Sequence, residues 1–432
     1  MHPQRHRRPF RRRPADEVVD PRPYAEILRQ WSSLHPEFSF LPRKFKVAVT
    51  GAKHDRAAIQ VHDIGLEAKC DGSGALGFAV WVGGGQGRTP MIARKVRDFL
   101  PEEDLLAYCE AILRVYNLEG RRDNKYKARI KILVHEMGEE ALKRAVEAEF
   151  AHTRGRALTL PREEVERIAA YFAPPALELL PARSAAFEAA QRADAALARF
   201  AARNLHPHRT PGHAIVTVSL KPIGGAPGDA TASQMEAVAD IAERFAGGEI
   251  RVSHEQNLVL PHVRLDDLPA VHAELARAGL ATPNAGLVTD IIACPGLDYC
   301  SLANARSIPV AQRISERFAD LDRQHDIGEL KIKISGCINA CGHHHVGHIG
   351  ILGVDRRGEE FYQITLGGSA DERTSIGEIV GKGFSAAEIV DAIEAVVETY
   401  LRLRASPAEK FLDAYRRLGE APFREALYAE AA

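Results

Sequence analysis

Two stretches of the chain show the same order of hydrophobic and polar positions, although they lie far apart. KFKV at 44–47 and KIKI at 331–334 each alternate lysine with a hydrophobic residue, and Lys331 follows Lys44 by 287 residues. Successive side chains point to opposite faces of a strand, so each stretch predicts a β-strand with its lysines on one face.

The likeness extends beyond these two strands. Each is followed by an apolar run that ends in paired glycines, by an Arg-Thr pair, and by an acidic, Ala- and Leu-rich helical pattern. These features lie at 83–84, 88–89 and 102–117 in the first copy, and at 367–368, 373–374 and 385–403 in the second. Because the matches keep their order at a nearly constant offset, we infer an internal duplication of strands, a glycine turn and a helix.

Two other kinds of pattern lie between the copies. Residues 137–211 are rich in Ala, Glu and Arg at helical spacing and predict a helical connector. Residues 212–283 read as strand, helix, two strands and helix, which is the β-α-β-β-α order of a ferredoxin-like unit. The predicted fold class is therefore α+β, with a first repeat at 21–136, the connector, a ferredoxin-like α/β unit, and a second repeat at 284–432.

The beginning of the chain departs from this plan. Symmetry predicts a ferredoxin-like unit before the first repeat too, but only 43 residues precede Lys44, so we expect the chain to lack a quarter of the duplicated protein. Residues 1–20 are expected to form a disordered basic tail, because their arginines repel one another and show no hydrophobic period. A phosphate-binding arm and a start that is not the native one are the alternatives.

The composition narrows the class of protein. Fifty-seven Lys and Arg residues balance 58 Asp and Glu, which gives no electrostatic reason to expect nucleic acid or an anionic membrane as a partner. No apolar run is long enough to span a bilayer and no apolar signal segment stands near the start, so we expect a cytoplasmic protein. The GGGQG run at 83–87 lacks the spacing of a dinucleotide-binding fingerprint, so no flavin or nicotinamide site is expected.

Four of the six cysteines form two close pairs along the chain, Cys294 with Cys300 and Cys337 with Cys341. Four thiolates in two short loops suit a 4Fe-4S cluster, which takes one sulfur for each iron. A structural zinc site, which usually has tighter C-x2-C spacing, and buried cysteines without any ligand role are the alternatives. Cys109 lies among Leu and Ala on a predicted helix and is expected in the core.

These residues carry a resemblance to a known family. ACPGLDYC at 293–300 and SGCINACGHHHVGHIGILG at 335–353 together resemble the paired cysteine motif of the siroheme-dependent sulfite and nitrite reductases. LPRKFKVAVTG at 41–51 is similar to the lysine-bearing strand of that family, and the likeness runs from about Pro21 to the end of the chain. The resemblance implies two cofactors: a 4Fe-4S cluster held by the four cysteines, and siroheme, whose iron Cys341 would share with the cluster.

The resemblance also implies a reaction, the six-electron reduction of sulfite to sulfide or, as the alternative, of nitrite to ammonia. Arg43, Lys44 and Lys46 match the family's basic residues around the small anionic substrate. Arg43 would also face the cofactor, as would Asn339. Cationic donors suit this role because they attract an oxyanion and donate hydrogen bonds to it. The electrons would come from a partner protein, either a ferredoxin or a flavoprotein reductase subunit.

One departure limits what the resemblance implies. The family's other arginines for substrate and siroheme come from the unit that symmetry predicts before the first repeat, and Arg251 and Asn257 of the second half do not replace them. We therefore expect weak cofactor binding, and a non-functional fragment or a zinc-stabilised scaffold is the alternative to an enzyme. The histidines at 343–345 and 348 are expected to pack around the cluster instead of binding metal.

Overall fold

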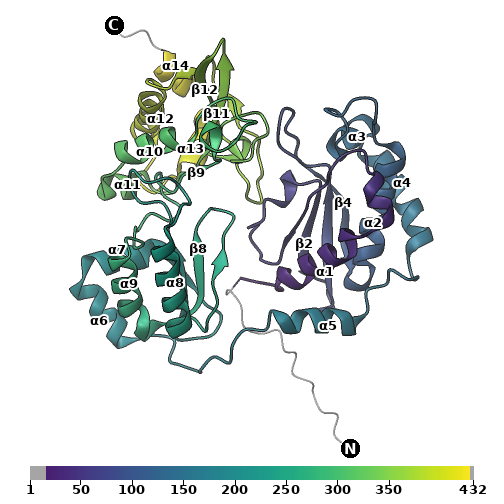
Figure 1. Cartoon of the computed structure of the whole chain (residues 1–432), viewed down its shortest axis with the longest axis horizontal. Helices are drawn as coiled ribbons and strands as arrows, with labels where there is room; N and C mark the ends of the chain where they lie inside the picture. The colour runs from purple at the N-terminus through teal and green to yellow at the C-terminus, as the bar shows by residue number, and fades with distance from the viewer. Residues whose placement is uncertain (1–15, 429–432) are drawn as a thin grey trace, which may run out of the picture. The chain divides into compact units, whose positions relative to one another are not determined.

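The computed structural model describes residues 16–428, which form two compact units (Figure 1). The first unit holds the residues up to 176 together with 370–374, and the second holds 177–369 and the residues from 375 onward. Within the described residues, the first unit is built on a single sheet and the second on two.

The first unit is a four-stranded sheet covered by helices. Strand β1 (Val47–Thr50) runs parallel to β2 (Ile64–Cys70), and β3 (Leu76–Val82) and β4 (Arg94–Pro101) continue the sheet antiparallel in the order β1-β2-β3-β4. The described helices of this unit are α1 (Pro21–Ser33), α2 (Leu105–Glu119), α3 (Ile130–Met137), α4 (Glu139–Thr153) and α5 (Arg162–Tyr171). Short 3-10 turns η1 (Pro36–Phe40) and η2 (Ile59–Val61) lie before β1 and β2.

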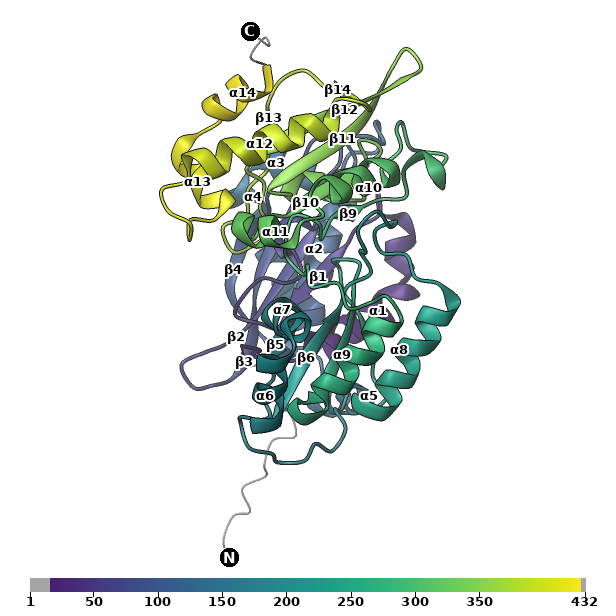
Figure 2. The same ribbon diagram turned by 90° about the vertical axis from the view of Figure 1, so that its left-hand side faces the viewer.

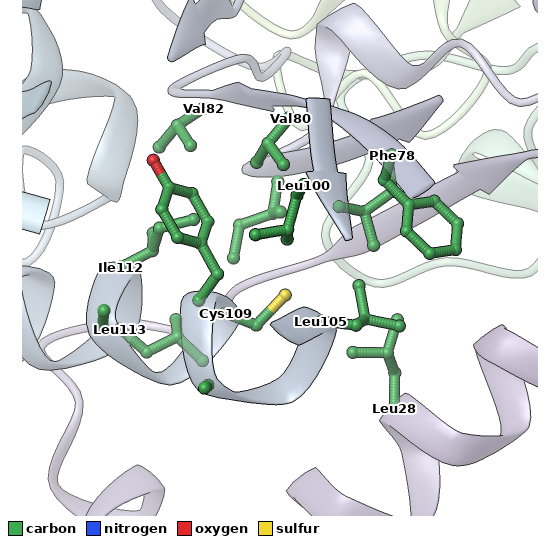
Figure 3. Packing of buried hydrophobic residues seen from close by; sticks show 14 of the residues in the cluster. Leu28, Phe78, Val80, Val82, Leu100, Leu105, Cys109, Ile112 and Leu113 are labelled. Carbon is green, nitrogen blue, oxygen red and sulfur yellow. The ribbon is translucent and has the colours of Figure 1, made fainter. Parts of the chain in front are cut away.

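The hydrophobic core of the first unit lies between its sheet and helices α1 and α2. Figure 3 shows Leu28 of α1, Phe78 of β3 and Leu105 of α2 pointing toward one another. All three are buried, so their apolar surface is removed from water. Cys109 lies completely inside this core, as the sequence predicts, and burial raises the pKa of its thiol to about 12.

The second unit begins with the ferredoxin-like part. Strands β5 (Leu205–Pro207), β6 (His213–Val218), β8 (Leu258–Arg264) and β7 (Arg251–Val252) form an antiparallel sheet in the order β5-β6-β8-β7. Helices α8 (Ala232–Phe245) and α9 (Leu268–Arg277) lie side by side against this sheet (Figure 2). The chain order β6-α8-β7-β8-α9 confirms the predicted topology. Helix α8 begins at Thr231, which forms a capping box with Gln234.

The second repeat forms the other sheet of this unit. Its parallel strands are β9 (Ile292–Ala293), β10 (Ile332–Ser335) and β11 (Ile349–Arg356). Strand β12 (Glu359–Leu366) pairs antiparallel with β11. The short strands β13 (Glu378–Ile379) and β14 (Phe384–Ser385) pair antiparallel with the other edge of β12. The described helices are α10 (Ile308–Arg317), α11 (Leu321–Ile327), α12 (Ile389–Leu403), α13 (Phe411–Leu418) and α14 (Ala421–Tyr428).

The two repeats share one strand plan, which confirms the predicted duplication. In each, a strand runs parallel to a second strand, which turns back through a hairpin, and a long helix follows. Val47 pairs with Ile64 in the first repeat, and Ile332 pairs with Ile349 in the second. Both members of the second pair follow their counterparts by 285 residues.

This register corrects the alignment of the two lysine motifs. At an offset of 285 residues Lys331 is the counterpart of Lys46, not of Lys44, and Lys333 is the counterpart of Ala48. Backbone hydrogen bonding between the strands fixes the register, whereas the recurring lysine spacing is a short motif that matches two residues out of step.

Only the last five residues of the predicted basic tail, 16–20, belong to the described part of the chain. Residues 1–15 lie outside the described part of the chain, but residues 16–20 are not a tail. The N–H groups of Val18 and Val19 donate to the carbonyl of Gly51, at 2.7 and 3.1 Å, and the carboxylate of Asp20 caps helix α1.

The predicted connector, 137–211, is largely helical and contains α4, α5, α6 (Ala185–Ala193) and α7 (Ala195–Asn204). Its helical part ends at Asn204 because Leu205–Pro207 forms β5, the first strand of the ferredoxin-like sheet. Between residues 16 and 428, no helix combines the length and apolar composition needed to cross a bilayer.

Candidate functional site

The two cysteine pairs lie on loops that leave neighbouring strands. Cys294 directly follows β9, and Cys337 follows β10 after one intervening glycine. Because β9 and β10 run parallel, their carboxyl ends meet at the same edge of the sheet. Ile334 pairs with Ala293 there, and the N–H of Cys294 donates to the carbonyl of Ile334 at 3.1 Å. Strand pairing therefore brings together two loops that lie about forty residues apart in the chain.

The peptide of Gly336 joins the two cysteine loops directly. Its N–H lies 3.1 Å from Sγ of Cys294 and donates to that sulfur. Its carbonyl accepts from the N–H groups of Asn304 and Ala305, at 2.7 and 3.0 Å. The hydroxyl of Ser307 lies 3.4 Å from the same sulfur. The residue before Cys337 is thus held by the loop that carries Cys294 and Cys300.

Glycine is required where these loops touch. A Cβ on Gly336 would lie 2.5 Å from the carbonyl oxygen of Ala305 and 2.9 Å from Cα of Gly296. Gly296 itself has a φ of +61°, a conformation that side chains disfavour. The carbonyl of Gly296 also accepts a hydrogen bond from the N–H of Cys300, at 2.9 Å.

The four cysteines differ in exposure. Cys294 and Cys337 are each 8% exposed, Cys300 is half-buried, and Cys341 is exposed. Among residues 16–428, no three His, Cys, Asp or Glu side chains are grouped so that they could hold a single metal ion. A four-iron cluster makes a different demand, because it takes one sulfur at each of four separate irons.

The remaining residues of the motif also have defined places. Asn339 lies exposed between Cys337 and Cys341. His344 is fully buried, and neither of its ring nitrogens has a hydrogen-bond partner. Burial first, and then the neighbouring histidines, lower the pKa of His344 to about 3, so its ring is neutral. Its ring lies 3.9 Å from that of His345, measured between centroids.

The basic residues of the first repeat lie in the first unit, whereas the four cysteines lie in the second. Arg43, Lys44 and Lys46 are all exposed, and Phe45 between them is half-buried against the core. The side chains therefore alternate as predicted. The expectation that Lys44 and Lys46 lie on a strand is wrong, since β1 begins at Val47.

A buried carboxylate holds the backbone of Lys46. Asp63 is completely buried, and its carboxylate accepts from the N–H of Lys46 at 2.9 Å. The guanidinium of Arg129 lies 2.7 Å from both carboxylate oxygens of Asp63. The N–H of Gly83 donates to the carbonyl of Asp63 at 2.9 Å. Asp63 thus connects the basic segment, helix α3 and the first glycine turn.

Lys131 closes the loop that follows this turn. It is buried, and its ammonium donates to the carbonyl oxygens of Gln86 and Thr89, at 2.7 and 2.6 Å. Burial first, and then the charge of Arg129, lower the pKa of Lys131 to about 8, while Asp63 opposes this shift. The GGGQGRT run is therefore a loop whose backbone carbonyls are held by the buried ammonium of Lys131.

The sequence did not point to Asp63, Arg129 and Lys131. Asp63 precedes a buried strand and the two cations flank the start of α3, so each reads as an ordinary polar residue at the end of an element. The available signal was Arg129-x-Lys131, a second basic pair like that of Lys44 and Lys46, but nothing in its spacing links it to the glycine turn.

Comparison with known proteins gives the class to which this fold and these loops belong. The family model for the nitrite and sulphite reductase 4Fe-4S domain matches residues 4–154 and 285–432. The model for the nitrite/sulfite reductase ferredoxin-like half domain matches 206–278. The chain therefore belongs to the nitrite and sulfite reductase family, whose members are oxidoreductases that carry siroheme and a 4Fe-4S cluster.

Some similar proteins are named sulfite reductases and others nitrite reductases. The chain is 28% identical over 409 residues to sulfite reductase (ferredoxin) 2 of Mycolicibacterium paratuberculosis, which covers 92% of this chain and 66% of the relative. It is 27% identical over 401 residues to the chloroplastic ferredoxin–nitrite reductase of Arabidopsis thaliana, which covers 88% of this chain and 61% of the relative. The chain thus spans somewhat less than two thirds of the length of these relatives.

A solved structure supports the fold. The structure of the NirA protein of Mycobacterium tuberculosis matches with a TM-score of 0.73 at 24% sequence identity, over 96% of this chain and 70% of that one. At this identity the match speaks for the arrangement of the elements and not for the chemistry. The α+β fold with two reductase repeats around a ferredoxin-like unit is confirmed.

Proposed function

We propose that Cys294, Cys300, Cys337 and Cys341 hold a 4Fe-4S cluster and that the chain reduces sulfite to sulfide with this cluster and siroheme. The observation that carries the proposal is the Gly336 peptide, whose N–H donates to Sγ of Cys294 at 3.1 Å. Because this peptide directly precedes Cys337, the contact joins the two cysteine loops and supports a single site.

The donor set suits a cluster in chemical terms. Thiolate sulfur is the ligand that iron–sulfur clusters use, and an N–H donated to a ligating sulfur stabilises its charge. The two buried cysteines anchor the site, while the more exposed Cys300 and Cys341 lie on loops beyond the strand ends.

The remaining residues of the proposal serve siroheme and the anion. Cys341 would share the siroheme iron with the cluster, and Asn339 beside it would face the same cofactor. Arg43, Lys44 and Lys46 are exposed cations whose roles are to attract the oxyanion and donate hydrogen bonds to it, and Arg43 would also meet the cofactor. When bound, the cluster and siroheme would pass single electrons from the donor protein to the anion.

Nitrite is the second candidate substrate, because curated relatives of similar identity are named for it. Sulfite and nitrite are both small oxyanions, and exposed cations attract either of them. A ferredoxin is the proposed electron donor, since the relatives for both substrates are named as ferredoxin enzymes, and a flavoprotein reductase subunit is the alternative.

The first test is cofactor content. The purified chain is incubated anaerobically with ferrous iron and sulfide, and iron and acid-labile sulfide are counted per chain in the wild type, Cys337→Ser and Cys70→Ser. Cys70 is exposed and lies in the other unit, which makes it the matched control. About four irons and four sulfides in the wild type and Cys70→Ser, with a severalfold loss in Cys337→Ser, are expected. Zinc without sulfide, or equal iron in all three proteins, would refute the cluster.

The second test is turnover. The chain reconstituted with cluster and siroheme is supplied with electrons from reduced methyl viologen. The product sulfide is measured when sulfite is the substrate, and the product ammonium is measured when nitrite is the substrate. Lys46→Met should lower the specificity constant at least tenfold relative to Lys53→Met, because Lys53 is an exposed lysine outside the proposed anion site. Faster nitrite reduction would reverse the choice of substrate, and no turnover with either anion would refute the activity.

A further inference from the structure

Three lysines are buried among residues 16–428, and one of them lacks a partner. Lys131 donates to two carbonyl oxygens, and Lys221 forms an ion pair with Asp290. Lys333 is 6% exposed, and within the described part of the chain its ammonium makes no hydrogen bond or ion pair. The function proposed above does not use this group.

Lys333 lies in the middle of a sheet. It is on β10, which is bonded on its two edges by β9 and β11. Ile332 and Ile334 on either side of it belong to the hydrophobic core, so alternation turns Lys333 to the opposite face. A Cβ on Gly347 would lie 3.0 Å from Cβ of Lys333, so the backbone at Gly347 covers the base of this side chain.

Lys331, directly before β10, has counter-charges. Its ammonium nitrogen lies 3.6 Å from a carboxylate oxygen of Glu329 and 3.9 Å from one of Glu255. The other carboxylate oxygen of Glu329 lies 2.7 Å from the ammonium of Lys410. Two carboxylates therefore balance Lys331 and Lys410, and neither carboxylate bonds Lys333.

The buried pair of Lys221 and Asp290 is also complete. Lys221 donates to Oδ1 of Asp290 at 2.5 Å and to the carbonyl of Glu255. The amide of Asn257 donates to the same Oδ1 at 3.1 Å, and the N–H of Gly286 donates to Oδ2 at 2.8 Å. The charge of Asp290 is thus matched by that of Lys221, and the pair leaves no counter-charge for the cations around it.

Lys333 is therefore the buried cation that the neighbouring carboxylates leave uncompensated. Burial first, and then the charge of Lys331, lower the pKa of Lys333 to about 8, while Glu255 opposes this shift and Lys221 adds to it. With a pKa of about 8 the ammonium is still mainly charged at pH 7. A buried charge without a partner costs free energy, and a bound anion removes that cost.

His254 adds a second donor near Lys333. It lies in the turn between β7 and β8 of the ferredoxin-like part, is exposed, and interacts electrostatically with Lys333 and Lys331. Between residues 16 and 428 its ring nitrogens have no hydrogen-bond partner. A neutral imidazole keeps one N–H, which can donate to an anion. The cluster thus combines a buried ammonium with an exposed ring donor.

The duplication relates this cluster to the basic segment of the first repeat. At the 285-residue offset Lys331 is the counterpart of Lys46, and His348 is the counterpart of Asp63. The N–H of Lys46 donates to Asp63, and the N–H of Lys331 donates to Nδ1 of His348 at 3.3 Å. The second repeat therefore holds a lysine in the same way, at the place that the first repeat uses for the proposed anion.

We propose that Lys333 and His254 bind a small inorganic oxyanion, of the class of sulfate, in a site built wholly from the second unit. Lys333 supplies the uncompensated charge, His254 donates a ring N–H, and the half-buried Lys331 adds attraction. The site uses none of the four cysteines, so the proposal does not depend on the cluster or on siroheme.

The donors and the nearby acids together select the ligand. An oxyanion offers several acceptor oxygens to an ammonium and a ring N–H that approach from different residues, and this suits it better than a halide. Glu255 and Glu329 lie beside Lys331 and would repel an anion of high charge. An anion of one or two charges is therefore expected, and not a polyphosphate.

The first test is sulfate binding by the purified full chain without cofactors. Equilibrium dialysis with radiolabelled sulfate counts the equivalents that the wild type, Lys333→Met and Lys382→Met bind. Lys382 is an exposed lysine of the same unit, so its variant loses the same charge. Lys333→Met should weaken the binding of one equivalent at least tenfold, and Lys382→Met should change it less than twofold. Methionine removes the uncompensated buried charge, so Lys333→Met is expected to fold.

Two controls locate the bound anion. Lys46→Met should keep the equivalent, because Lys46 lies in the first unit. Phosphate and sulfite should displace the labelled sulfate, and chloride at the same concentration should not. The proposal is overturned if no saturable binding is seen, if Lys46→Met loses the equivalent that Lys333→Met keeps, or if chloride competes equally well.

The second test observes Lys333 in the wild-type chain. Lysine labelled with 13C at Cε reports the titration of each ammonium by NMR, and the signal of Lys333 is the one missing from Lys333→Met or Lys333→Arg. Sulfate should raise its titration midpoint by about one pH unit or more relative to chloride at the same ionic strength, because a bound anion stabilises the ammonium. The signal of Lys382 should not move. An equal midpoint of Lys333 in sulfate and chloride would overturn the proposal, whatever the outcome of the cluster and turnover tests.

Discussion

The N–H of Lys46 donates a 2.9 Å hydrogen bond to the carboxylate of Asp63, which also forms the buried ion pair with Arg129. The basic segment that we assign to the anion is therefore positioned by a group that never meets solvent. An exposed lysine has many rotamers, but the hydrogen bond to the buried ion pair restrains the backbone of Lys46. The backbone position of the basic segment is therefore restrained, while its flexible lysine side chains can adapt to anions of different shape.

The first prediction concerns this ion pair. Asp63→Asn should lower the free energy of unfolding of the first unit by about 3 kcal/mol or more, because it leaves the guanidinium of Arg129 without a counter-charge. Both tryptophans, Trp31 and Trp81, lie in this unit, so intrinsic fluorescence during urea denaturation measures its unfolding.

Two variants control this measurement. The side chain of Asp98 is 83% exposed and forms an ion pair with Lys95. Asp98→Asn should therefore lower the free energy of unfolding by less than about 0.5 kcal/mol. Adding Arg129→Met to Asp63→Asn should recover part of the loss, because it removes the uncompensated charge. Equal stabilities of Asp63→Asn and Asp98→Asn would show that the pair is not structural.

The second prediction is a pH dependence at Lys131. Its pKa is about 8 in the folded protein, below the ordinary 10.5, so between these values the unfolded chain binds a proton that the folded chain does not. Raising the pH from 8 to 10 should therefore stabilise the wild type relative to Lys131→Met, by at most about 1.4 kcal/mol per pH unit. Below pH 8 the difference between the two proteins should be constant.

The measurement is urea denaturation at pH 7, 8, 9 and 10, followed by tryptophan fluorescence. Lys127→Met, at an exposed position in the same segment, should show no such trend relative to the wild type. A stability difference for Lys131→Met that stays flat from pH 7 to 10 would show that the buried ammonium keeps its ordinary pKa.

The third prediction follows from the duplication. A Cβ on Gly84 would lie 2.3 Å from the carbonyl oxygen of Gln60, and one on Gly368 would lie 2.5 Å from that of Gly347. Alanine at either position should therefore destabilise its own unit by about 1–3 kcal/mol, because the glycine turn must move away from the backbone behind it.

Gly72→Ala is the control, because nothing lies within 4 Å of a Cβ at that position. It should be neutral or slightly stabilising, since alanine restricts the unfolded chain. Fluorescence measures Gly84→Ala, and amide hydrogen exchange along β12 measures Gly368→Ala in the second unit. If Gly84→Ala is as stable as Gly72→Ala, the close approach is not a constraint.

The sequence was sufficient for the fold where a local pattern determines the structure. Alternation predicted which of Lys44, Phe45 and Lys46 face solvent, and the recurring glycine turns revealed the duplication. It was insufficient where contacts between distant segments decide. The carboxylate of Asp63 meets Arg129 only because α3 returns to the start of β2, and 66 residues separate them. The register between the repeats likewise depends on strand pairing, so the lysine motifs aligned two residues out of step.

The last prediction concerns Gln256, whose side chain holds the strand before Cys294. Its amide nitrogen donates to the carbonyl of Ala293 at 2.9 Å, and its amide oxygen accepts from the N–H of Ala293 at 3.0 Å. Strand β10 bonds the other edge of β9. The side-chain amide of Gln256 therefore makes the backbone hydrogen bonds that a neighbouring strand would make on the outer side of β9. We expect Gln256 to be a positioning residue for Cys294.

The contribution of this clamp can be measured at one amide. Gln256→Gly removes both hydrogen bonds while it keeps the backbone φ of +58° accessible. Two hydrogen bonds are worth about 1–3 kcal/mol, so exchange of the Ala293 amide hydrogen should accelerate by about 5- to 150-fold. Gln256→Glu should give an intermediate rate, because its carboxylate still accepts from that N–H but repels the carbonyl.

The clamp should also affect the proposed cluster. In Gln256→Gly, iron should be lost from the reconstituted protein severalfold faster under a chelator, whereas Gln30→Gly, in the other unit, should leave the rate of loss unchanged. If the Ala293 amide exchanges at the wild-type rate in Gln256→Gly, strand β10 alone fixes the position of Cys294. Faster exchange with unchanged iron loss would mean that the clamp stabilises the strand without positioning the ligand.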